Sequence, residues 1–223
     1  MSIERLKTTC INSQTKAKKL IVWLHGLGAN GQDFVPLVSQ LNLTDPKQYK
    51  WIFPHAPNIP ISINRNMVMP AWYNIFGLAL NTPEDEVNIM KSNHQLQYLI
   101  EQEMEAGFAS EDIFIGGFSQ GGAMALHLGL RFPYRLNGIL ALSGYLPLRH
   151  RLNADNHPIN ASTPIFLAHG QIDPVVPYLF GQLAYEQLKA LQYPVAWHSY
   201  PIEHAISQDE IRDIRYFLEK TNT

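Results

Sequence analysis

Short apolar runs alternate along the chain with longer segments in which apolar residues recur every three or four positions. Each short run is apolar throughout rather than at every second position, which is typical of strands buried on both faces of a parallel sheet. Five such runs predict strands, at residues 20–24, 51–53, 113–115, 138–142 and 164–168, and the mixed run at 195–200 predicts a further one. Because helical segments lie between them, the pattern predicts an α/β fold with helices on both faces of a mostly parallel central sheet.

The longer segments predict helices whose ends carry recognisable signals. Residues 84–105 begin with three acidic side chains, which suit the positive end of a helix dipole, and Gly107 marks the end of this helix. The last helix begins at residues 207–210, whose serine and glutamate fit a capping box. Further helices are predicted at residues 34–41, 120–131 and 179–191. Since 223 residues show no repeat or linker, we expect a single domain over residues 1–223.

Residues 57–83 interrupt the alternation as an apolar loop insertion. This stretch contains four prolines and many large apolar side chains, and their spacing fits neither a strand nor a helix. Long loops inside compact domains are often functional. Two interpretations stay open, a loop folded onto the core and a wall or lid for an apolar substrate.

The segment Gly117-Phe118-Ser119-Gln120-Gly121 carries the strongest chemical signal. It lies between a predicted strand and a predicted helix, the context in which Gly-x-Ser-x-Gly exposes a nucleophilic serine. The glycines remove side chains that would clash in so sharp a turn, and the helix N-terminus favours developing negative charge. We therefore expect Ser119 to be a nucleophile, with a glycine-rich turn without chemistry as the weaker alternative.

A serine hydroxyl needs a base to remove its proton and a carboxylate to orient that base. Asp173 follows the strand predicted at 164–168, at the sheet edge where α/β proteins place their sites. Of nine histidines, only His204 is both downstream of Asp173 and in a loop after a predicted strand. Asp155 is a weaker rival because no clear strand leads into it. The order serine, aspartate, histidine is that of α/β-hydrolases.

The oxyanion formed during acyl transfer needs hydrogen-bond donors that are fixed in advance. One donor is expected to be the backbone N–H of Gln120, directly after the nucleophile. The second is expected from the glycine-rich loop at residues 25–31, which follows the first predicted strand. The alternative is an ordinary turn at the end of a strand. It explains this loop by itself but not its occurrence together with the predicted serine, aspartate and histidine.

These elements lie within longer motifs, by which the chain resembles the family of acyl-protein thioesterases and carboxylesterases, itself similar to lysophospholipases. The motifs are spread over nearly the whole chain, at residues 23–28, 53–57, 69–73, 116–122, 142–147 and 169–177. The resemblance implies an α/β-hydrolase fold and a catalytic triad of Ser119, Asp173 and His204. It also implies that the backbone N–H groups of Leu27 and Gln120 bind the oxyanion.

Further residues are implied to form an acyl channel. Leu78 and Val175 match positions that line the channel of the family, and Trp72 is expected to contact the substrate with them. The chain departs from the family before the base, where Pro-Ile-Glu at 201–203 replaces the usual Gly-Met-x, and Ala205 replaces a common serine. These departures leave the triad intact and bear on acyl preference and on the tuning of the base.

The sequence thus predicts a serine carboxylesterase or thioesterase that hydrolyses esters or thioesters of short to long acyl chains through an acyl-enzyme intermediate, without a metal or other cofactor. A lysophospholipase-type lipid esterase is the main alternative. A serine peptidase and a non-catalytic binding protein on the same scaffold are less favoured. So is a metal-dependent hydrolase, since the spacing of its candidate ligands matches no known motif. These ligands are His25, His55, His169 and Asp173.

Charge and composition narrow the partners and the location. Acidic and basic residues are well mixed, with a formal net charge of −2, so no nucleic-acid partner is expected. No apolar run is long enough to span a bilayer, residues 1–7 contain no apolar leader, and Cys10 is the only cysteine. We expect a cytoplasmic protein acting on a small-molecule or lipid-like ester or on an S-acylated protein. The family resemblance makes a homodimer plausible.

Overall fold

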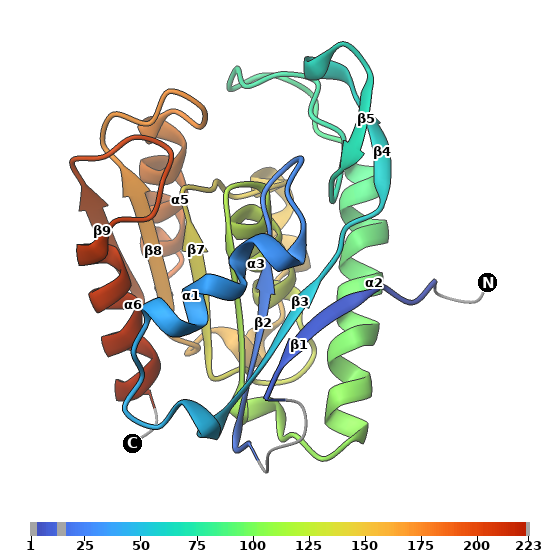
Figure 1. Ribbon diagram of the computed structural model, residues 1–223. Helices are drawn as coiled ribbons and strands as arrows, with labels where there is room; N and C mark the ends of the chain where they lie inside the picture. Colours follow the sequence, from blue (N-terminus) through green and yellow to red (C-terminus); the bar gives the residue numbers. More distant parts are fainter. Residues whose placement is uncertain (1–3, 13–16, 222–223) are drawn as a thin grey trace.

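A seven-stranded sheet forms the centre of residues 4–12 and 17–221, the part of the chain that the computed structural model describes (Figure 1). The spatial order of the strands is β1-β3-β2-β6-β7-β8-β9. All neighbours are parallel except β1 and β3, which are antiparallel. The strands are β1 Thr8–Ile11, β2 Lys19–Leu24, β3 Tyr49–Pro54, β6 Ile113–Phe118, β7 Gly138–Leu142, β8 Ile165–Gly170 and β9 Val195–Tyr200.

The continuous apolar runs of the inner strands become strands that are buried on both faces, as predicted, whereas β9 at the sheet edge is buried only at Tyr200. Every residue of β7 and β8 is buried, and so is every residue of β2 after Lys19. All six predicted strands are present. The short edge strand β1 is an addition, and it alternates between exposed and half-buried positions.

Helices cover both faces of the sheet, which confirms the predicted α/β architecture (Figure 1). Side chains of α2, α3 and α5 pack in one apolar core, and side chains of α1 and α6 pack in a second core across the sheet. Among the described residues, no helix is both long enough and apolar enough to cross a membrane. The helices are α1 Val35–Gln40, α2 Glu86–Glu105, α3 Gln120–Arg131, α4 Leu152–Asp155, α5 Tyr178–Ala190 and α6 Gln208–Lys220.

The ends of two helices show which local signals operate. Helix α2 begins at Glu86 rather than at residue 84, because the side chain of Asp85 accepts a hydrogen bond from the backbone N–H of Asn88 and caps the helix. Gly107, with a φ of +115°, follows its last turn as predicted. At α6 the predicted capping box is present, with Ser207 as N-cap and Glu210 as its partner.

The apolar insertion at residues 57–83 contains a hairpin that the sequence did not predict. Strands β4 Asn58–Ile61 and β5 Met67–Pro70 pair antiparallel, and Figure 1 shows them standing beyond the end of α2. Left-handed backbone at Arg65 and Asn66 turns the chain between the strands. The segment that follows returns to the molecule at Trp72, which is 1% exposed.

The strand order places a crevice at the centre of the sheet. From β2 the chain continues outward on one side through β3, whereas β6 and the strands after it continue outward on the other side. Ligands of open α/β sheets bind at such a switch point, beyond the carboxyl ends of the strands. The glycine-rich loop after β2 and the Gly-x-Ser-x-Gly turn after β6 therefore meet at this position.

Candidate active site

Ser119 is the single residue between β6 and α3, and its backbone is left-handed, with φ 56° and ψ −122°. Its N–H donates to the carbonyl of Leu142 at 2.8 Å, which fixes the turn on the neighbouring strand. The flanking glycines are sterically required. A Cβ at Gly121 would lie 2.1 Å from the carbonyl oxygen of Leu24, and one at Gly117 would lie 2.5 Å from the backbone of Gly121. The turn thus has the strained backbone that the predicted nucleophile elbow requires.

His204 and Asp173 form a short hydrogen bond although 31 residues separate them in the sequence. Nδ1 of His204 lies 2.6 Å from Oδ2 of Asp173, whose side chain is fully buried. The other carboxylate oxygen, Oδ1, accepts the backbone N–H groups of Val175 and Val176, at 2.8 Å each. A carboxylate cannot donate, so Nδ1 of the histidine carries the proton. In the neutral imidazole Nε2 is then the basic nitrogen.

A cavity of about 500 Å³ brings the predicted nucleophile and the predicted base together. Ser119 and His204 both line it, with Gln120 and Leu27. Much of the remaining lining is apolar and comes from the insertion and from the loop after β8. These apolar residues include Ile63, Ile75, Leu78 and Val175, and Phe34, from the turn before α1, adds a further apolar side chain.

The loop after β2 lies directly against the nucleophile. A Cβ at Gly26 would come within 3.3 Å of the Cβ of Ser119, so only glycine permits this approach without displacement. Gly28 is left-handed, with φ +76°, and its N–H donates to the carbonyl of Pro70 at 2.8 Å. On the opposite side Gln120 begins α3, where backbone N–H groups have no acceptor within the helix.

His25 holds this loop in place through its two ring nitrogens. Nε2 accepts the backbone N–H of Ala56 at 3.1 Å, so Nδ1 carries the proton and donates to the carbonyl of Gly26 at 2.8 Å. The indole N–H of Trp72 donates to the carbonyl of His25 at 2.9 Å. Burial lowers the pKa of His25, so the ring stays neutral and acts as a structural brace.

The sequence profile of the phospholipase/carboxylesterase family matches residues 7–222 of this chain. The chain belongs to this family. It is therefore a hydrolase of ester bonds with an α/β-hydrolase fold, which confirms the predicted fold, family and enzyme class.

Relatives and solved structures agree with this family assignment. Acyl-protein thioesterase 1 of Neurospora crassa is 38% identical over 227 residues, which cover 97% of this chain and 92% of the relative. The crystal structure of Arabidopsis thaliana SOBER1 is similar with a TM-score of 0.88 and 30% identity, covering 93% of this chain and 100% of that one. The crystal structure of Zea mays acyl-protein thioesterase 2 gives 0.84 and 29%, covering 97% and 99%.

Most of the residues predicted for the site lie around one cavity. Leu27, Leu78 and Val175 line the cavity of Ser119. Trp72 does not line it within the described part of the chain, because the indole is buried and bonded to the carbonyl of His25. The indole contacts the loop that carries Leu27, and the substrate contact expected of Trp72 stays a prediction.

The side chain of Gln120 makes two hydrogen bonds that the sequence did not predict. Only the backbone N–H of this residue was expected to take part in the site. The side-chain oxygen of Gln120 accepts the N–H of Trp72 at 3.0 Å, and its amide nitrogen donates to the carbonyl of Tyr73 at 2.8 Å. A polar side chain that is 2% exposed therefore ties the insertion to the elbow. Its only signal in the sequence is a glutamine within an otherwise apolar and glycine-rich run.

The ligand set of the metal-dependent alternative is not assembled. Among the described residues, no group of three or more His, Cys, Asp or Glu side chains is arranged to hold a metal ion. Both ring nitrogens of His25 contact backbone atoms, and Nε2 of His169 lies 2.8 Å from the carbonyl of Val176. His55 contacts the hydroxyl of Thr9 and the N–H of Gly31.

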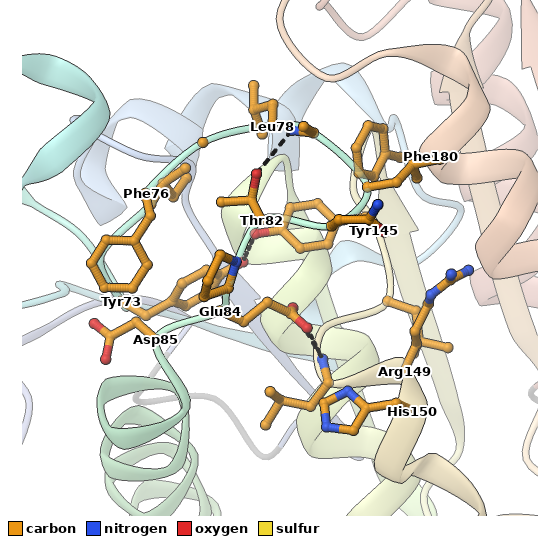
Figure 2. A pocket seen from close by; sticks show the side chains of 18 of the residues that line it. Tyr73, Phe76, Leu78, Thr82, Glu84, Asp85, Tyr145, Arg149, His150 and Phe180 are labelled. Atoms are coloured by element: carbon orange, nitrogen blue, oxygen red, sulfur yellow. Dashed lines mark hydrogen bonds between the residues drawn. The ribbon is translucent and has the colours of Figure 1, made fainter.

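A second cavity, of about 390 Å³, lies beside the first and is shown in Figure 2. Ile75, Leu78 and Tyr145 line both cavities, so the segment at residues 74–83 and the ring of Tyr145 separate them. The hydroxyl of Tyr145 lies 2.6 Å from that of Tyr73 at this boundary.

The second cavity has a polar side as well. Glu84 accepts the backbone N–H of Leu148 with both carboxylate oxygens, at 3.1 and 3.0 Å (Figure 2). Burial raises the pKa of Glu84. Arg149 and His150 lie on the same side. The charged groups make this cavity chemically different from the apolar wall around Ser119.

Proposed function

We propose that this chain is a serine carboxylesterase or thioesterase whose catalytic triad is Ser119, His204 and Asp173. The observation that carries the proposal is the 2.6 Å hydrogen bond between His204 and Asp173, on a histidine that lines the cavity of Ser119. Two distant loops thereby supply an oriented base beside a serine on a strained elbow, the arrangement of a serine hydrolase.

The reaction proceeds through an acyl-enzyme. Nε2 of His204 removes the proton of the Ser119 hydroxyl as its oxygen attacks the carbonyl carbon of the ester or thioester. Asp173 stabilises the imidazolium that forms. The same histidine then gives the proton to the departing alcohol or thiol. Water, deprotonated by His204, releases the acid and restores the serine.

The oxyanion of both steps is bound by the backbone N–H groups of Leu27 and Gln120. This assignment is supported by the place of Leu27 in the loop beside Ser119 and by the position of Gln120 at the start of α3. Donors held by buried contacts such as those of His25 need little reorganisation during the reaction, and one such donor contributes about 10²–10³-fold in kcat.

The acyl chain lies along the apolar wall that contains Leu78 and Val175. These side chains are partly exposed around the mouth of the cavity, where an acyl chain would shield their apolar surface from water. We propose an S-acylated protein as one substrate, because several relatives are acyl-protein thioesterases. A lysophospholipid shares the acyl group and stays the alternative. A cytoplasmic location and a homodimer are further predictions, tested by cell fractionation and by light scattering.

The proposal is tested by replacing the nucleophile. Ser119→Ala is expected to lower kcat/KM for an aryl ester by at least about 10³-fold while leaving thermal unfolding cooperative. A fluorophosphonate should label the unaltered enzyme on Ser119 and leave Ser119→Ala unlabelled. The matched control is Ser39→Ala, an exposed serine in α1. Retained turnover in Ser119→Ala would contradict the assignment.

Parallel assays then decide the substrate class. An S-palmitoylated peptide, the corresponding oxygen ester and a lysophosphatidylcholine would be compared by kcat/KM. Higher values for the peptide thioester support the thioesterase, whereas higher values for the lysolipid favour the lipid esterase. Activity that survives a chelator is expected in both cases.

A further inference from the structure

A second histidine, which the proposed mechanism does not use, lies against the carboxylate of Asp173. His169 is in β8, at the sheet edge that carries the site, and it is 1% exposed. Its Nε2 lies 2.8 Å from the carbonyl oxygen of Val176 and 3.5 Å from Oδ2 of Asp173. The ring thus contacts both ends of the turn 173–176, on which the orienting carboxylate is carried.

The protonation of this ring follows from its partners. A carbonyl oxygen only accepts, so Nε2 of His169 carries the proton and donates it to Val176. Burial lowers the pKa of His169, so the ring is neutral and this is its single N–H. A neutral ring also avoids placing a second positive charge beside Asp173, where it would compete with the imidazolium of His204.

The position of the ring is fixed from the other side by α5. A Cβ at Gly181 would lie 2.4 Å from Nδ1 of His169, so only glycine lets the helix approach this closely. The ring of Tyr178 packs edge-on against the imidazole, with centroids 6.0 Å apart. His169 is therefore held between the helix and the turn, and it has no room to turn away.

We propose that His169 is a positioning residue that fixes the turn 173–176, so that Oδ2 of Asp173 faces His204. The two N–H groups of Val175 and Val176 hold Oδ1, and the hydrogen bond from His169 holds the carbonyl of Val176. Together they leave one carboxylate oxygen for the base. This inference rests on the proposed function, because it assigns Asp173 to the triad.

The role predicts a kinetic signature. His169 does not line the cavity of Ser119 among the described residues, so we expect it to act through Asp173 rather than by contact with the substrate. A loosened carboxylate weakens the stabilisation of the imidazolium, which exists in the transition state and not in the ground state. Its loss should therefore lower kcat and leave KM almost unchanged.

The test compares two amides of different reach. The amide nitrogen of His169→Gln can take the place of Nε2 and donate to Val176, whereas that of His169→Asn is too short. We expect His169→Gln to keep kcat within about 3-fold of the unaltered enzyme and His169→Asn to lose about 10- to 100-fold, since small misplacements in an active site cost this much. The control is His127→Asn at another fully buried histidine, which lies in α3 and outside the cavity of Ser119. It should keep kcat.

Equal kcat values for His169→Gln and His169→Asn would overturn the inference, as would an equal loss in His127→Asn. A second measurement does not depend on turnover. The Nδ1 proton of His204, bonded to Asp173, gives a strongly downfield ¹H NMR signal, which should persist in His169→Gln and move upfield or broaden in His169→Asn. An unchanged signal in both would also overturn it. Suppose that Ser119→Ala loses the fluorophosphonate label while both His169 variants keep the kcat of the unaltered enzyme. This result would reject the inference about His169 alone and leave the proposed function standing.

Discussion

The ring of Phe118 packs against the imidazole of His204, with ring centroids 4.7 Å apart and planes tilted by 47°. Phe118 directly precedes Ser119, so the residue beside the proposed nucleophile contacts the proposed base. The phenyl ring also meets Phe34, at a centroid distance of 6.0 Å. The imidazole is thus held by a ring on one side and by the carboxylate of Asp173 at its Nδ1.

Removing this ring contact should reduce turnover without removing a chemical group. Phe118→Ala leaves the imidazole of His204 free to tilt, and we expect kcat to fall about 10- to 100-fold. Phe118→Leu should lose less, because it still fills part of the space. Steady-state kinetics at a temperature where both variants are folded provide the measurement. The control is Phe108→Ala, which removes a partly buried ring near Lys50 on the other apolar core. If kcat falls as far in Phe108→Ala as in Phe118→Ala, the loss comes from general destabilisation and not from the contact with His204.

The carboxylate that orients the base can be neutralised with little change of shape. In Asp173→Asn the amide can present its N–H₂ to His204, which favours the tautomer with the proton on Nε2 and removes the basic lone pair that should face Ser119. We expect kcat to fall about 10³–10⁴-fold, as in other serine hydrolases with this change. Single-turnover kinetics should show slow acylation. Asp155→Asn, in the ion pair with Arg151, serves as the control and should retain activity.

The apolar wall of the cavity should govern the preference for acyl chain length. Leu78→Asn places a polar amide where an acyl chain would lie, and we expect kcat/KM for an octanoate ester to fall at least about 10-fold while that for an acetate ester changes less than about 3-fold. Val87→Asn makes the same exchange on the outside of α2, at a side chain that is 78% exposed. It should change neither value. Equal losses for both esters in Leu78→Asn would argue against an acyl site there.

The stability of the protein should depend on a buried acid in the first turn of α6. Burial raises the pKa of Glu210 to about 8 from its ordinary 4.5. The folded state then holds the proton of Glu210 more tightly than the unfolded state does, and this tighter binding stabilises the fold. The stabilisation is fully present below pH 4.5 and is lost as the pH rises to about 8. Glu210→Gln imitates the protonated form and can still accept the N–H of Ser207.

Urea unfolding at several pH values tests this dependence. The free energy of unfolding of Glu210→Gln should exceed that of the unaltered protein at pH 8.5 by more than at pH 5, a difference of about 1 kcal/mol or more. A difference that is the same at both pH values would show that the carboxyl of Glu210 does not titrate in this range.

The fold was largely predictable because the inner strands of its sheet are buried on both faces. Runs such as residues 20–24 and 138–142 are apolar at every position and are too short for an ordinary helix, which favours buried strands. Strand β1 escaped prediction because it lies at the sheet edge, where Thr8 and Thr9 are as acceptable as apolar residues. The β4–β5 hairpin escaped because its two strands pair with each other beyond the main sheet, so no buried face imposes a regular pattern.

The site was predictable where chemistry demands a residue type at a strand end. Chain order and loop position predict Ser119, Asp173 and His204 as a triad, and the structure brings the histidine to the aspartate and to the cavity of the serine. The contacts of Trp72 and His169 could not be identified in this way. Each depends on which backbone carbonyl the folded chain brings to a ring nitrogen, and no local pattern encodes that pairing.

The positive φ of Ser119 serves the proposed activity but lowers the stability of the fold. A serine in this conformation costs about 1–3 kcal/mol, a penalty that glycine would largely avoid. A dead variant with glycine at this position should therefore melt at a higher temperature than the working enzyme. Screens that rank variants of this chain by cellular abundance would then favour the inactive ones at this position.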